Sequence, residues 1–131
     1  MNRNDLRKRL KGPIASLVTP FDQEGRLSPA GLRKEIQFLL AAGIKVLVCN
    51  GSIGEFSSLT ISERKQVLEG TLKHAGDKAL VVAGCASSDL ETALELSDHA
   101  AVAPLKRTKA IDSLRCVSGW PGFRSKIGAA C

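Results

Sequence analysis

The stretch IKVLVCNGSIGEF, residues 44–56, joins an apolar run directly to a glycine-rich turn. The run is apolar on both faces, which favours a strand buried within a parallel sheet over a half-exposed antiparallel strand. Glycine has no Cβ, so a turn with Gly51 and Gly54 leaves backbone N–H groups and the small hydroxyl of Ser52 open to an anion. The segment therefore predicts a buried strand followed by a binding loop.

Helix signals lie on both sides of this strand. Upstream, Ser28 is a natural N-cap followed by a proline in the first helical position, and the apolar spacing predicts a helix over about Pro29–Ala42. Downstream, Thr60 and Glu63 form a T-x-x-E capping box before a helix that should stop at Gly76. The strand is therefore expected between two helices.

Two further strands and a third helix complete the pattern. We expect strands over PIASLVTPF, residues 13–21, and KALVVAGCA, residues 78–86, with Ser88 and Glu91 forming a second capping box before the last helix. This β-α-β-α-β-α order implies parallel strands joined by right-handed crossovers. Periodicity alone allows an open doubly wound sheet or part of a (β/α)8 barrel.

Three loops of this pattern should share one edge of the sheet. In both architectures ligands bind at the carboxyl ends of the strands, where Thr19, the Gly51–Glu55 loop and residues 84–88 lie. The loop is not a Walker phosphate loop, because no Gly-Lys-Ser/Thr closes it, and it lacks the G-x-G-x-x-G spacing of a dinucleotide turn. A general anion site is what these residues predict by themselves.

Length and composition indicate one globular domain. The chain has 131 residues, of which 44% are apolar and 24% charged. No apolar run approaches the roughly 18 residues that a membrane helix needs, and residues 1–12 lack the apolar core of a secretory signal. We therefore expect a cytoplasmic protein with no membrane partner.

Side chains that commonly bind metals are dispersed along the chain. His74 and His99 lie near the ends of expected helices without a cluster of other ligands. The cysteines show no C-x-x-C spacing and are expected to be reduced structural thiols: Cys49, Cys85, Cys116 and Cys131. The sequence predicts neither a metal site nor a cofactor.

Positive charge is concentrated at the end of the chain. Residues 1–101 carry 13 lysines and arginines against 12 acidic residues, whereas residues 102–131 carry Asp112 and six basic residues: Lys106, Arg107, Lys109, Arg115, Arg124 and Lys126. Only Trp120 and Phe123 accompany them, without the periodicity expected of a nucleic-acid-binding face. We expect an irregular basic tail, atypical of the preceding residues and derived from a shifted reading frame or a truncated gene copy.

Four short motifs, taken together, resemble the dihydrodipicolinate synthase and N-acetylneuraminate lyase family. They are T-P-F at 19–21, G-S-I-G-E-F at 51–56, L-T-x-x-E-R at 59–64 and V-V-A-G-C at 81–85. The resemblance implies an α/β fold, with residues 1–101 forming about the first three βα units of a (β/α)8 barrel and residues 102–131 a separate tail. It also implies a lyase of the class I aldolase type, in which a lysine forms a Schiff base with pyruvate or a related 2-oxo acid, within a homo-oligomer.

The same resemblance assigns roles to the glycine-rich loop. Gly51, Ser52 and Ile53 match the positions that bind the 2-oxo acid carboxylate, and Ser52 matches a hydroxyl that joins a proton relay with tyrosines. Ile53 stands where many members have threonine, so one hydroxyl is lost. We expect Glu55 to act mainly by accepting hydrogen bonds from loop N–H groups, and Thr19 to bond within the protein rather than to substrate.

The resemblance also implies catalytic parts that this chain does not contain. The chain has no tyrosine, and the matched segment ends before the sixth strand, which carries the Schiff-base lysine in the family. We therefore expect a catalytically incomplete lyase; the alternative is a non-catalytic 2-oxo acid binding or subunit-interaction module, and a nucleic-acid partner for the tail is the least favoured reading. Roughly six to nine inward-facing side chains of the three strands should lack the cover of the opposite barrel wall. We expect the chain to associate or to be molten.

Overall fold

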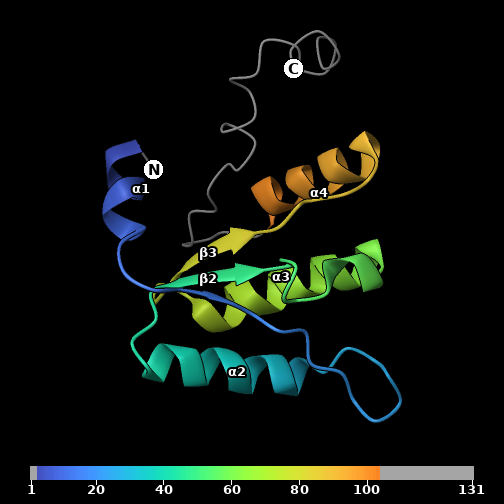
Figure 1. The fold of residues 1–131 in the computed structure, drawn as a ribbon, viewed down its shortest axis with the longest axis horizontal. Coiled ribbons are helices and arrows are strands. Elements are labelled where there is room, and N and C mark those ends of the chain that lie inside the picture. The colour runs from blue at the N-terminus through green and yellow to red at the C-terminus, as the bar shows by residue number, and fades with distance from the viewer. Residues whose placement is uncertain (1–2, 104–131) are drawn as a thin grey trace, which may run out of the picture.

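The computed structural model describes residues 3–103, which form a sheet of three strands, three longer helices beside it and a short N-terminal helix (Figure 1). In chain order the elements are α1 Arg3–Arg9, β1 Ile14–Ser16, α2 Pro29–Ala41, β2 Val46–Cys49, the 3-10 helix η1 Phe56–Ser58, α3 Ile61–Ala75, β3 Leu80–Ala83 and α4 Leu90–Val102. From β1 onward this is the expected alternation, whereas α1 was not predicted. The expected tail lies, from residue 104, outside the described residues.

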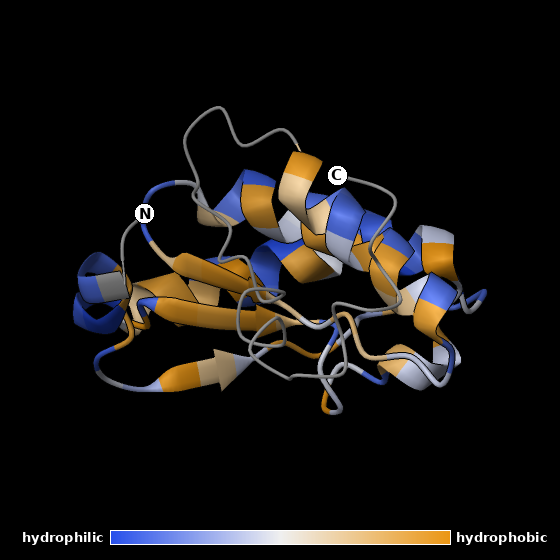
Figure 2. Ribbon diagram, turned by 90° about the horizontal axis from the view of Figure 1, so that it is seen from above, coloured by the Kyte–Doolittle hydropathy of each residue, from blue (hydrophilic) through white to orange (hydrophobic). Residues whose placement is uncertain are grey.

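The three strands form one parallel sheet in the order β1-β2-β3. Ile14, Val46 and Leu80 are register partners across the sheet, so their side chains share one face. The strands are largely hydrophobic, as their orange colour in Figure 2 shows. The prediction of a buried, parallel β2 is confirmed.

Local signals explain where α2 and α3 begin. The Ser28 hydroxyl accepts a hydrogen bond from the Gly31 N–H at 3.2 Å, so the predicted N-cap of α2 is confirmed. The predicted capping box of α3 is also confirmed: Thr60 Oγ1 accepts from the Glu63 N–H at 3.2 Å, and Glu63 Oε2 accepts from the Thr60 N–H at 2.8 Å. Gly76 ends α3 as predicted.

Three sequence predictions were wrong in detail. The cap of α4 is Asp89 rather than Ser88, because the Asp89 carboxylate accepts from the Thr92 N–H at 2.8 Å and from the Ser87 hydroxyl at 3.0 Å. The first strand ends at Ser16 rather than at residue 21: the Leu17 N–H still donates to the Val48 carbonyl at 2.8 Å, but the Val18 N–H donates to Glu35 Oε1 of α2 at 2.9 Å. The third strand is likewise shorter than residues 78–86.

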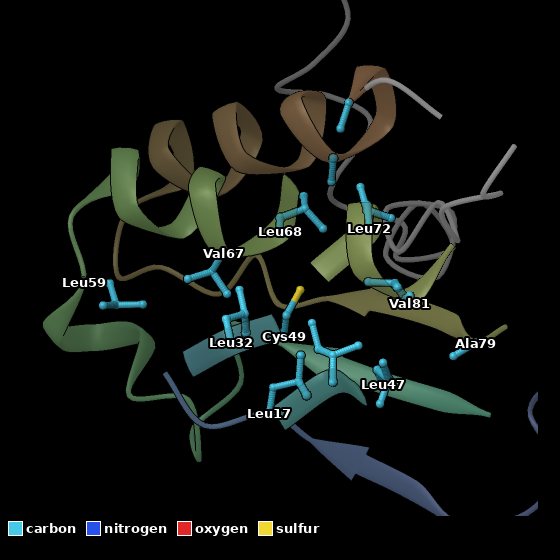
Figure 3. Packing of buried hydrophobic residues seen from close by; sticks show 14 residues of the cluster. Leu17, Leu32, Leu47, Cys49, Leu59, Val67, Leu68, Leu72, Ala79 and Val81 are labelled. Atoms are coloured by element: carbon cyan, nitrogen blue, oxygen red, sulfur yellow. The ribbon is translucent and has the colours of Figure 1, made fainter. Parts of the chain in front are cut away.

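The core lies between the sheet and the helices. Leu17, Leu32, Leu47 and Val67 are among the buried side chains that meet there (Figure 3).

The opposite face of the sheet is covered unevenly. Val46 and Leu80 are buried, whereas Ile14 is 55% exposed and Val18, just beyond β1, is 49% exposed. The expectation that this whole face is bare was therefore too strong. No described helix has the length and apolar character needed to cross a membrane.

Candidate functional site

The loops that follow the three strands meet at the carboxyl edge of the sheet. The Thr19 hydroxyl, beyond β1, donates a hydrogen bond to the Gly54 carbonyl at 2.7 Å. The Gly84 N–H, beyond β3, donates to the Cys49 carbonyl at the end of β2 at 2.8 Å. Both neighbouring loops thus contact the chain around the glycine-rich turn. The expectation that Thr19 bonds within the protein agrees with this contact.

The glycine-rich loop is a tight turn whose two ends have left-handed backbone. Asn50 has φ 54° and Glu55 has φ 53°, and the Glu55 N–H donates to the Ser52 carbonyl at 3.0 Å. Ser52 and Ile53, at the tip, are exposed, and Ile53 is 63% exposed. The loop therefore presents a hydroxyl and an apolar side chain to solvent, with small residues on either side.

Glu55 does not play the part that the sequence predicted. Its carboxylate is exposed and makes no capping hydrogen bond to η1, so it does not accept from the N–H groups of that turn. The residue contributes instead through its left-handed backbone, which ends the loop. An acidic residue at the start of a short turn does not always cap that turn, and sequence spacing alone does not show whether it does.

Two glycines allow the loops to approach closely. A Cβ at Gly84 would lie 2.1 Å from the Asn50 carbonyl oxygen, and a Cβ at Gly54 would lie 3.0 Å from the Leu17 carbonyl oxygen. The first distance is far inside van der Waals contact, so only glycine fits at position 84 without movement of the backbone. The sequence motif marked both glycines but did not show what each one contacts.

Arg64, in the first turn of α3, is the main site residue that sequence reasoning missed. Its side chain is 4% exposed; Nη1 donates to the Ala86 carbonyl at 2.9 Å and Nη2 to the Gly84 carbonyl at 3.0 Å. The Phe56 ring lies 5.0 Å from the guanidinium carbon, and Asn50 Nδ2 donates to the Arg64 carbonyl at 2.9 Å. The only sequence signal was the arginine that ends L-T-x-x-E-R.

The guanidinium of Arg64 is a buried positive charge with neutral acceptors. Burial lowers the pKa of Arg64, but an arginine keeps its proton in a protein. Among residues 3–103, no carboxylate forms an ion pair with it, and its Nε makes no hydrogen bond. This edge of the sheet therefore holds one buried positive charge without an ion-pair partner, and the glycine-rich loop beside it carries the exposed carboxylate of Glu55.

The cysteines of the described part differ in exposure, and both are free. Burial raises the pKa of Cys49 to about 12, so this thiol is an unreactive core residue. Cys85, in the loop after β3, is half-buried. Reduced structural thiols were expected at both positions, and the free state of both agrees with that expectation.

Four lysines of the described residues lie at the amino edge of the sheet or on α3, and their side chains are exposed or paired with a carboxylate. Lys45 and Lys78 are exposed and precede β2 and β3, so they lie at the amino edge of the sheet. Lys73 is exposed in the last turn of α3, and Lys65 pairs with Glu95 of α4. None of these four lysines is therefore part of the glycine-rich loop.

The histidines also lie on the helices. His99 Nε2 lies 3.1 Å from Glu69 Oε1 and links α4 to α3. Burial lowers the pKa of His74, and the nearby charges of Lys73 and Arg33 add to this effect.

Within residues 3–103, no group of three His, Cys, Asp or Glu side chains is arranged to hold a metal ion. The described site offers a hydroxyl, backbone donors and positive charge, which suit a small carboxylate.

Comparison with known proteins identifies relatives for most of this region. The model of the Dihydrodipicolinate synthetase family matches residues 9–107. The chain is 38% identical over 91 residues to the 4-hydroxy-tetrahydrodipicolinate synthase of Brucella abortus biovar 1, which is 70% of this chain and 31% of the relative. It is 43% identical over 81 residues to an N-acetylneuraminate lyase of Escherichia coli O1:K1 / APEC, which is 60% of this chain and 27% of the relative.

Solved structures show the same relationship in the fold. Dihydrodipicolinate synthase from Bacillus clausii matches with a TM-score of 0.72 and 29% identity over 80% of this chain and 34% of that one. The sialic acid aldolase of Ruminococcus gnavus matches with a TM-score of 0.71 and 31% identity over 78% and 34%. The chain thus spans about a third of the length of these proteins. The prediction of a partial (β/α)8 barrel is confirmed.

Proposed function

The chain belongs to the dihydrodipicolinate synthetase family, and we propose that its Gly51–Glu55 loop binds the carboxylate of a 2-oxo acid such as pyruvate. The observation that carries the proposal is the exposed Ser52 hydroxyl at the carboxyl edge of the sheet, on a loop whose carbonyl at Gly54 is held by Thr19. Gly51 precedes Ser52 and Gly54 follows Ile53, and neither glycine has a Cβ to keep an anion from the backbone N–H groups.

The three residues of the binding position have different roles in this proposal. Gly51 and Ile53 contribute backbone N–H groups, and Ser52 adds a hydroxyl that also occupies the position of the proton relay. Ile53 has no hydroxyl, which removes one neutral hydrogen bond worth about 0.5–1.5 kcal/mol net. Compared with a loop that has two hydroxyls, this loop should therefore bind a 2-oxo acid more weakly or prefer a different 2-oxo acid. Binding should not be abolished.

We propose further that this chain is derived from a Schiff-base lyase and is catalytically incomplete by itself. Its 131 residues contain no tyrosine for a relay, and the described lysines lie at the amino edge of the sheet or on the helices. The proposal includes residues 1–101 as the barrel portion and residues 102–131 as a distinct tail. It also includes a cytoplasmic location and a homo-oligomeric parent enzyme.

Borohydride trapping tests the catalytic part of the proposal. The full chain is incubated with pyruvate and sodium borohydride, and its intact mass is compared with that of a full-length lyase treated in parallel. We expect an adduct on the full-length lyase and none on this chain. A stoichiometric adduct on one lysine of this chain would show that it assembles an active nucleophile.

Hydrogen exchange read by mass spectrometry tests the binding part. Pyruvate should slow exchange in the peptide that contains residues 50–56, and its uncharged methyl ester should do so less because it lacks the carboxylate. In Ser52→Ala this protection should fall more than in Ile53→Ala, since only Ser52 supplies a side-chain hydroxyl. Equal losses in the two variants, or no protection in the parent chain, would contradict the assignment.

A subunit-interaction module is the second candidate function. It is favoured by the half-exposed side chains of Ile14 and Val18 on the face of the sheet that the helices do not cover. The open edges of β1 and β3 add unpaired backbone groups to that surface. The two candidates predict different results. The interaction module requires that chains associate and that pyruvate does not protect residues 50–56 from hydrogen exchange.

A further inference from the structure

Arg64 contacts the chain at both ends of the proposed 2-oxo acid loop. Asn50 precedes the loop, and its Nδ2 donates to the Arg64 backbone carbonyl at 2.9 Å. Phe56 follows the loop, and its ring lies 5.0 Å from the guanidinium carbon of Arg64. The five residues between them, Gly51–Glu55, are therefore flanked on both sides by residues that contact Arg64.

The same side chain also holds the loop that follows β3. Nη1 and Nη2 donate to the carbonyls of Ala86 and Gly84, at 2.9 and 3.0 Å. The Gly84 backbone in turn lies so close to Asn50 that a Cβ would come within 2.1 Å of the Asn50 carbonyl oxygen. Only a planar guanidinium has two donors fixed at a spacing that reaches both carbonyls, so lysine cannot replace it fully.

The charge of Arg64 adds to these contacts. The residue is 4% exposed and its acceptors are neutral carbonyls, with no carboxylate paired to it among residues 3–103. A buried charge without a counter-ion is costly, and an anion bound close by reduces that cost. A carboxylate ligand at the adjacent loop would supply such an anion.

We propose that Arg64 is the positioning residue of the 2-oxo acid loop, which fixes its two ends against the loop after β3 and favours a carboxylate ligand through its buried charge. Arg64 acts through Asn50, Phe56 and Gly84 rather than as a catalytic group. The ligand in this proposal rests on the proposed function, whereas the effect of Arg64 on the loops does not.

The test is hydrogen exchange of the full chain, with and without pyruvate, in two variants of Arg64. Arg64→Met removes the charge and both donors, and Arg64→Lys keeps the charge but not the paired geometry. Arg33→Met, at an exposed arginine of α2, controls for the substitution itself. Leu68→Ala, at a buried position of α3, controls for a general loss of stability.

In Arg64→Met we expect exchange in residues 50–56 and 84–88 to be at least about tenfold faster, as for loss of two hydrogen bonds from a charged donor, with residues 67–75 of α3 unchanged. Arg64→Lys should lie between the parent chain and Arg64→Met. Leu68→Ala should instead speed exchange throughout α3, and Arg33→Met should change neither loop. Pyruvate protection should be lost in Arg64→Met and partly kept in Arg64→Lys.

The failures of the two proposals are distinguishable. If pyruvate protects nothing in the parent chain, the proposed ligand is wrong, and the exchange rates without ligand still decide the role of Arg64. If Arg64→Met speeds exchange in α3 as well, Arg64→Lys decides, because it retains the charge and most of the volume. Loops that exchange at parental rates in both variants would overturn the proposal.

Discussion

Replacing Ile14 and Val18 by threonine should weaken self-association of the chain. These side chains are 55% and 49% exposed beside buried neighbours, so they form the uncovered part of a sheet face. Threonine keeps the β-branched shape that suits a strand and removes apolar surface. We therefore expect the double variant Ile14→Thr/Val18→Thr to shift the chain towards monomer.

The magnitude follows from the exposed fractions. Full burial of a large aliphatic side chain is worth about 1.5–3 kcal/mol, so covering the exposed half of each gives about 0.8–1.5 kcal/mol. Two side chains on each of two copies give about 3–6 kcal/mol, which corresponds to a change of about 10²- to 10⁴-fold in the dissociation constant. This is an upper figure, because threonine retains one methyl group.

Size-exclusion chromatography with light scattering, run over a range of chain concentrations, measures this shift. Phe38→Thr is the matched control, since Phe38 is 72% exposed on α2, whose buried Leu32 and Ile36 belong to the core on the other face of the sheet. It should leave the association unchanged. A parent chain that is monomeric at every concentration, or a double variant that associates as strongly as the parent, would refute the reasoning.

Three further predictions concern α3 and the loops. Thr60→Ala should lower the free energy of unfolding by about 1 kcal/mol through loss of the capping box, as measured by urea denaturation. The Thr60 N–H, and after it the Thr60 hydroxyl, lower the pKa of Glu63, so the part of the stability that Glu63 contributes to the capping box should be present above the unfolded pKa of a glutamate and be lost as the pH falls through the folded value. Iodoacetamide at pH 8 should alkylate Cys85 at least about tenfold faster than Cys49, whose burial raises its pKa to about 12; peptide mapping reads both sites, and equal rates would contradict the burial of Cys49. Gly84→Ala should destabilise the chain by about 1–3 kcal/mol through overpacking against backbone, and more where hydrogen bonds are lost. Gly70→Ala, which meets only the end of the Leu32 side chain at 3.0 Å, should be nearly neutral because alanine favours the helix by about 1 kcal/mol; limited proteolysis compares the two variants.

The fold could be predicted from sequence wherever a short segment carried its own signal. Ser28 and Thr60 precede apolar helical patterns, and both cap helices as expected. Ser88 and Asp89 are adjacent and equally suited to capping, so spacing alone could not choose between them; a carboxylate that accepts from two donors decided it. The end of β1 was not predictable either, because it depends on where the chain leaves its neighbour rather than on side-chain type.

The sheet face shows why a count of the inward-facing strand residues gave too large an estimate of exposure. Every inward side chain was counted as uncovered, since the rest of a barrel wall is needed to cover strands of this kind. Val46 and Leu80 lie on the same face as Ile14 and are nevertheless 0% and 1% exposed. The apolar surface that remains is narrower than expected and lies at the β1 edge. Association through β1 is therefore the specific form that the second candidate function takes.

The candidate loop was predictable because its evidence is local, and Arg64 was not because its evidence is spread over the chain. Gly51, Ser52 and Ile53 lie side by side in a recognisable turn directly after β2. The acceptors of Arg64 are backbone carbonyls 20 and 22 residues away, and a carbonyl has no side-chain type that a sequence pattern can report. A buried arginine with neutral acceptors also lacks the paired carboxylate that usually marks such a residue. At this edge of the sheet, a local sequence pattern therefore predicts the residues that present donors to a ligand. The residue that holds them in place is found only from contacts in the structure.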